Sequence, residues 1–95
     1  MARIEFDEQP LAAYAQLEKA SASMMLDAID DAIDLLESDP ADASVRRRSF
    51  SDGLWGIPVR DRSDDWLIIW EYDDQDSDLI VVRYLGADPF ARSRT

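Results

Sequence analysis

Apolar and polar residues alternate near the start of the chain and again through its second half. Ile4 and Phe6 alternate with charged residues, which predicts a short first strand. Three later segments have an alternating or continuously apolar pattern that predicts further strands. They are residues 55–60, 66–72 and 79–85. The acidic stretch 73–78 between the last two is short enough to close a hairpin.

Between the first strand and the others, apolar residues recur every three or four positions, as on one face of a helix. A first helix is marked by Leu11, Tyr14 and Leu17, and Asp7 and Pro10 suit its start. A second helix is marked by Leu26, Ile29, Ile33 and Leu36. Its carboxylates lie mainly away from that stripe, so one face is buried and the other solvated. Pro40 ends it, because the residue before a proline is driven out of the α region.

These elements follow one another in the order β-α-α-β-β-β. The sequence therefore predicts an α+β fold in which two N-terminal helices pack on one face of a small, mainly antiparallel sheet. Ninety-five residues are enough for one modest core, so the whole chain is expected to form one domain. Residues 91–95 are expected to form a flexible tail.

Composition removes several kinds of chemistry. The chain has no cysteine and no histidine, so disulfides, thiolate metal sites and the commonest general base are all excluded. The acidic stretch starting at Asp73 lacks the glycine and glutamate of a calcium loop, since Asp78 and Tyr84 fall at those positions. We expect no metal and no cofactor. No apolar run is long enough for a signal peptide or a membrane helix, which predicts a cytoplasmic protein.

The net charge of −11 also shapes the choice of partners. A strongly acidic protein repels phosphates at long range, so nucleic acid is not expected as a direct high-affinity ligand, and a basic partner protein is favoured. Three consecutive arginines, Arg46, Arg47 and Arg48, form the one basic run. They are candidates for contact with a phosphate backbone or an acidic partner. The alternative is that they balance nearby carboxylates.

Four segments resemble the RelE/ParE superfamily of toxin–antitoxin toxins. They are LLESDP at 35–40, GLWGIPVR at 53–60, WLIIW at 66–70 and VVRYLG at 81–86. Together with the order of elements, the resemblance covers about residues 3 to 90. It implies a toxin that is wrapped by the C-terminal segment of a cognate antitoxin. RNA-cutting members carry basic residues on the exposed face of these strands.

The chain departs from that catalytic pattern. The family's basic and polar positions fall on Gly56, Pro58, Leu67 and Glu71, and the stretch 86–90 lacks the family's arginine and terminal tyrosine. Removing one group that stabilises transition-state charge costs on the order of 100-fold or more in rate. The resemblance therefore implies a toxin that acts by binding, and the nearest analogue is the gyrase-poisoning ParE type. Whether the chain is an enzyme is left open by the sequence.

Two sets of residues are candidates for the binding surface. Arg60, Arg83 and Tyr84 could form the remnant of an active site, or simply occupy solvent-facing positions of the sheet. Four apolar residues of the last two strands are assigned to the face that the helices do not cover: Leu67, Ile69, Ile80 and Val82. An exposed apolar patch predicts a partner, either an antitoxin or a second copy in a homodimer. The alternative is a chain terminus that folds back over the patch.

Three functions follow from these observations. The first is a toxin-like component of a bacterial toxin–antitoxin system that acts by binding. The second is a non-toxic protein-interaction module on the same fold. The third is a ribosome-dependent endoribonuclease with an atypical site of Arg60, Arg83 and Tyr84. For the first two, Leu67→Asp is expected to disrupt association while leaving the fold intact.

Overall fold

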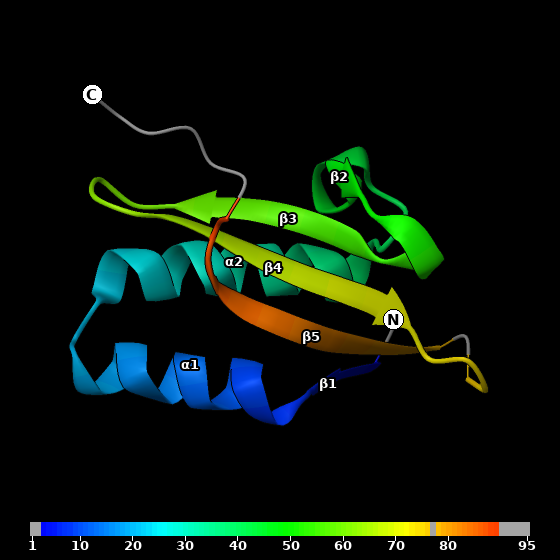
Figure 1. Cartoon of the computed structure of the whole chain (residues 1–95), viewed down its shortest axis with the longest axis horizontal. Helices are drawn as coiled ribbons and strands as arrows, with labels where there is room; N and C mark the ends of the chain where they lie inside the picture. The colour runs from blue at the N-terminus through cyan, green and yellow to red at the C-terminus, as the bar shows by residue number, and fades with distance from the viewer. Residues whose placement is uncertain (1–2, 77, 90–95) are drawn as a thin grey trace.

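The structure is a computed structural model that describes residues 3–76 and 78–89. Its helices and strands follow the predicted order (Figure 1). They are β1 (Arg3–Phe6), α1 (Glu8–Lys19), α2 (Ser23–Ser38), β2 (Arg48–Ser49), β3 (Trp55–Arg60), β4 (Asp65–Tyr72) and β5 (Leu79–Ala87). Two short 3-10 turns, η1 (Ala43–Arg46) and η2 (Ser51–Gly53), flank β2. The predicted tail, 91–95, lies outside the described residues.

The strands form one sheet in the order β1-β5-β4-β3-β2. β1 pairs with β5 in parallel, and the other neighbours are antiparallel. Both helices contribute to the core on the same side of the sheet, and α2 lies behind β3 and β4 in Figure 1. The predicted α+β fold is confirmed. The sequence did not predict β2, because a two-residue strand leaves no periodic pattern.

The core lies between α2 and the middle of the sheet. Its buried side chains include Met25, Ile29 and Leu36 from α2, and Ile57, Ile68 and Trp70 from the strands. Trp70 is fully buried, and its indole N–H donates a hydrogen bond of 2.8 Å to the carbonyl oxygen of Val45. This bond satisfies the polar end of a large buried ring and holds η1 against the sheet.

The pairing of β4 with β5 corrects one prediction. Ile80 and Val82 are buried in the helix-covered core, opposite Tyr72 and Trp70, and do not belong to the other face. A β-bulge then leaves Arg83 without a partner on β4 and places Tyr84 opposite Ile69. Because both strands are apolar on both faces, periodicity alone did not fix this register.

No helix in the described ranges is long and apolar enough to cross a membrane.

Arg46 belongs to the core layer. Its guanidinium lies 4.4 Å from the centroid of the Trp55 ring and 5.9 Å from the rings of Trp70 and Tyr72. It also donates hydrogen bonds to the Pro40 carbonyl at 2.7 Å and to the Tyr72 hydroxyl at 3.1 Å. With these contacts the side chain fastens η1 to the sheet. The hypothesis that Arg46 contacts a nucleic acid is not favoured by this geometry.

Arg46→Ala is expected to lower the free energy of unfolding by about 1–3 kcal/mol, because a cation–π contact and two hydrogen bonds are lost. Urea unfolding followed by tryptophan fluorescence measures the change. The neighbouring variant Arg47→Ala is the matched control, since Arg47 is exposed, and it should change stability by less than about 0.5 kcal/mol. Equal effects of the two substitutions would contradict the structural role of Arg46.

Candidate functional site

The helix-free face of the sheet carries an apolar cover of its own. A Cβ placed on Gly56 would lie 2.9 Å from the Phe50 ring and 3.1 Å from Cδ1 of Leu67. A Cβ on Gly86, which pairs with Leu67, would lie 3.0 Å from Cζ of the Tyr84 ring. Two aromatic rings thus lie over glycines next to Leu67, and Leu67 is 0% exposed.

Leu67 is therefore not part of an open apolar surface. Ile69 remains partly exposed on this face, and Tyr84 is partly buried with its hydroxyl donating to the Ala87 carbonyl at 2.7 Å. The apolar alternation of β4 thus contributes to a second buried layer rather than to an open patch. The prediction that this face binds a partner stays a prediction, and it cannot rest on exposure of Leu67.

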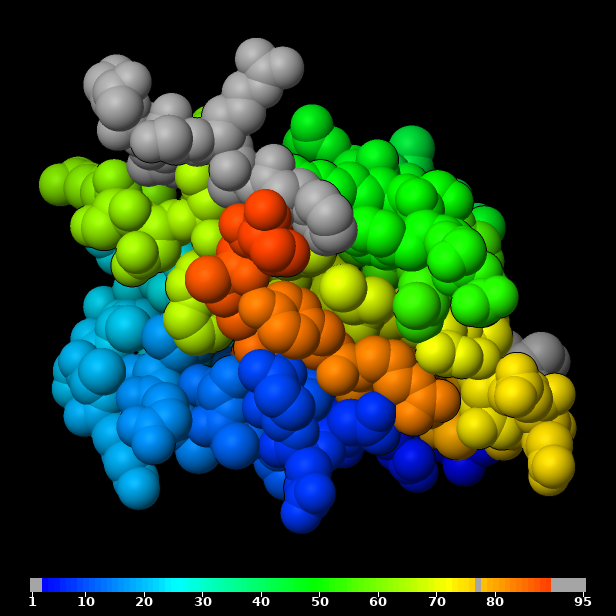
Figure 2. All heavy atoms as spheres, in the orientation of Figure 1, coloured from blue at the N-terminus to red at the C-terminus, as the bar shows by residue number. Residues whose placement is uncertain are grey.

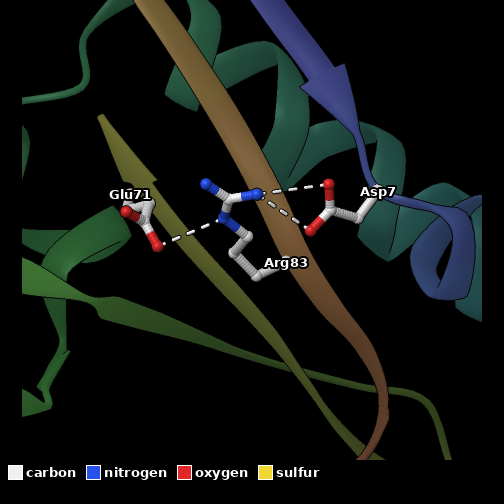
Figure 3. Close-up of polar contacts among 3 residues, drawn as sticks. All are labelled: Asp7, Glu71 and Arg83. Atoms are coloured by element: carbon white, nitrogen blue, oxygen red, sulfur yellow. Dashed lines mark hydrogen bonds and ion pairs between the residues drawn. The ribbon is translucent and has the colours of Figure 1, made fainter. Parts of the chain in front are cut away.

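Arg83 lies on the same face, between two carboxylates (Figure 3). Its Nη1 is 3.0 Å from Oδ2 of Asp7, and its Nε is 3.1 Å from Oε2 of Glu71. The bulge at Arg83 and the end of β1 bring these groups together, since Phe6 pairs with Val82. The hydrogen bond to Asp7 raises the pKa of Arg83 above its ordinary value. Two carboxylates already balance its positive charge.

Arg48 is also paired. Its Nη1 lies 2.7 Å from the Asp88 carboxylate, whose side chain is 2% exposed. The pair links β2 to the residue after β5, although β3 and β4 lie between these strands in the sheet. A buried carboxylate without a cation is costly, so Arg48 is committed to the fold.

Arg47 and Arg60 remain, and the structure brings them together. Both line a cleft of about 420 Å³, whose other lining residues are Arg48, Pro58, Val59, Asp65, Trp66 and Asp88. Figure 2 views the sheet from the side opposite α2, with the β2–β3 region in green and β5 in orange. Neither the Arg47 nor the Arg60 guanidinium makes a hydrogen bond or ion pair within residues 3–76 and 78–89.

A second, more apolar groove lies between α2 and β3. It has a volume of about 350 Å³ and shares Arg47, Pro58, Val59 and Arg60 with the first cleft. Its remaining lining residues are Ala28, Asp31, Ala32, Leu35, Ser44, Val45 and Ile57. The two hollows are therefore continuous around the outer edge of β3. We call them together the β3-edge cleft.

Six of the predicted site residues thus separate into three groups. Arg47 and Arg60 meet at the β3-edge cleft, whereas Arg83 and Tyr84 do not line it. Ile80 and Val82 lie in the core. The sequence did not predict the apolar side of the cleft. Ala28 and Ala32 contribute to it only because their small side chains leave space beside α2. Among the described residues, no cluster of three or more carboxylates is arranged to hold a metal ion.

The burial of Leu67 changes the expected effect of Leu67→Asp. A carboxylate placed there would be desolvated without a partner, so we expect a loss of about 3 kcal/mol or more in the free energy of unfolding. Urea unfolding measures it. The control Leu11→Asp makes the same change at a residue that is 59% exposed, and it should be close to neutral. A stably folded Leu67→Asp variant would show that the second apolar layer contributes little.

The chain was also compared with known proteins. No protein-family model, no curated protein and no solved structure matches it. What the domain does is therefore inferred from its own residues and geometry.

Proposed function

We propose that this chain is a RelE/ParE-like toxin component that acts by binding a protein rather than by cleaving RNA. The order of elements and the packing of both helices on one face agree with what the resemblance implied. The four similar segments lie at the end of α2 and on β3, β4 and β5, the strands that form the centre of the sheet.

Two cations of the helix-free face, Arg48 and Arg83, carry this proposal, because both are already paired. Phosphoryl transfer needs cations that are free to meet the charge developing on the phosphate. Here Arg83 is held by Asp7 and Glu71, and Arg48 is held by Asp88. A phosphate at either place would have to compete with carboxylates that are already bound.

The positions where RNA-cutting relatives carry basic groups support the same conclusion. Gly56 lies beneath the Phe50 ring, and Pro58 in β3 has a side chain without any polar group. Leu67 is buried, and Glu71 accepts a hydrogen bond from Arg83. None of these four side chains can stabilise negative charge.

The endoribonuclease alternative is weakened further because its three residues do not line the same cleft. Arg60 ends β3 and lines the β3-edge cleft, whereas Arg83 sits on β5 beside Asp7. The Tyr84 hydroxyl donates to the Ala87 carbonyl of its own strand. These three side chains do not surround one site.

The alternative of a non-toxic interaction module stands beside the proposal, because the β3-edge cleft offers a binding surface whether or not the partner is an antitoxin.

The proposal is tested by inducing the chain alone in a bacterial culture and following growth, RNA integrity and DNA supercoiling in the same samples. We expect intact RNA. Growth arrest with altered supercoiling supports a gyrase-directed toxin, and unaffected growth at confirmed soluble expression supports the non-toxic module. Cleaved mRNA that becomes intact in Arg83→Gln or Tyr84→Phe, but not in the surface control Lys19→Gln, would refute a binding-only mechanism.

A further inference from the structure

The outer edge of β3 is only partly covered by a neighbouring strand. β2 pairs with Trp55 and Gly56 alone, and within the described ranges no strand pairs with the outer side of residues 57–60. Pro58 has no N–H, which interrupts a continuous ladder of hydrogen bonds along that edge. A ligand on this edge must therefore be held mainly by side-chain contacts rather than as a full added strand.

One side of the β3-edge cleft is suited to apolar groups. Ala28 and Ala32 on α2 leave space that Leu35, Val45 and Ile57 line with hydrocarbon. The two hollows, about 350 and 420 Å³, each fall within the range of about 300–1,000 Å³ that is usual for small binding sites. Apolar side chains of a partner would therefore be removed from water here.

The other requirement comes from charge. Arg47 and Arg60 line both hollows and have no ion-pair partner in the described part of the chain. A guanidinium presents a planar fork of N–H donors that matches a carboxylate. The side chain that opposes this attraction on the apolar side is Asp31, which also lines the groove.

We infer that the β3-edge cleft docks a segment of a partner protein that combines apolar side chains with aspartate or glutamate. The inference rests on the proposed binding function and adds the surface and the chemistry of the partner. The apolar groups would enter the groove beside Ala28 and Ala32, and the carboxylates would pair with Arg47 and Arg60.

A nucleic acid fits the same cleft less well. Three arginines line the two hollows, but so do the three carboxylates Asp31, Asp65 and Asp88. Arg48 and Asp88 are already paired, so a polyphosphate near Arg47 and Arg60 would be opposed by Asp31 and by the −11 charge of the whole chain. A short segment with one or two carboxylates can meet the arginines while its apolar side chains occupy the groove.

The test is a selection of binders from a random displayed 12-residue peptide library, using the folded full chain as bait. Enriched peptides are expected to combine Leu, Ile, Val or Phe with Asp or Glu. Their dissociation constants are then measured by fluorescence anisotropy. Arg47→Glu and Arg60→Glu should each weaken binding at least about 10-fold, as expected for a lost and reversed charge contact. Asp31→Asn should strengthen it, and Lys19→Glu, with the same change in net charge, should have little effect.

Ala28→Gln provides a second variant that narrows the apolar side without changing charge, and it should also weaken binding. Circular dichroism confirms the fold of every variant. The inference is overturned if no peptide is enriched above a bait-free control, if enriched peptides are basic, or if they bind the Arg47→Glu and Arg60→Glu variants as well as the original chain. It is also overturned if a poly(U) RNA 12-mer binds in an Arg47-dependent way and the peptides do not.

These outcomes are separate from those of the proposed function. Cleaved RNA in the induced culture would defeat the binding-only mechanism whether or not peptides dock at β3. Conversely, peptides that bind elsewhere on the domain would defeat the assignment of this cleft and leave a binding function intact.

Discussion

Trp70 on β4 stands opposite Val82 on β5, and this pairing decides which side chains of the hairpin reach the helices. It places Ile80 and Val82 in the core and the large indole ring at its centre. The bulge that follows shifts Tyr84 to the helix-free face and leaves Arg83 beside the end of β1. A slip of one residue would exchange the two faces of β5, so the core and the ion pairs depend on the same register.

The second consequence of this register is that the sheet buries apolar residues on both faces. An antiparallel sheet with helices on one side normally solvates the other. Here the glycines Gly56 and Gly86 give room for the Phe50 and Tyr84 rings to lie close to the strands beside Leu67. The apolar pattern of β4 therefore stabilises the domain itself rather than forming an open apolar surface around Leu67.

Much of the fold could be predicted from the sequence, because helix periodicity and strand alternation are local signals. The stripe of α2, its end before Pro40, and the span of β3 were all predicted from neighbouring residues. The roles of the arginines were not, because each depends on groups distant in the chain. Arg83 pairs with Asp7, which is 76 positions away, and Arg48 pairs with Asp88 at a separation of 40. Arg46, Arg47 and Arg48 are consecutive, yet they contact an aromatic cluster, a cleft and a buried carboxylate, respectively.

Because these arginines have different partners, the local arrangement of charges says more about ligand binding than the net charge of the chain does. With 21 carboxylates and 10 cations, almost any exposed arginine could find a carboxylate at low cost. Arg47 and Arg60 nevertheless stand without an ion pair among the described residues, beside a groove lined by small and apolar side chains. The surrounding negative potential disfavours a polyanion at long range, but it acts weakly on a short segment that brings few charges and loses apolar surface on binding. Two unpaired arginines within a negatively charged surface favour a ligand that matches both the local positive charge and the apolar groove. This double requirement makes binding selective and does not by itself make it tight.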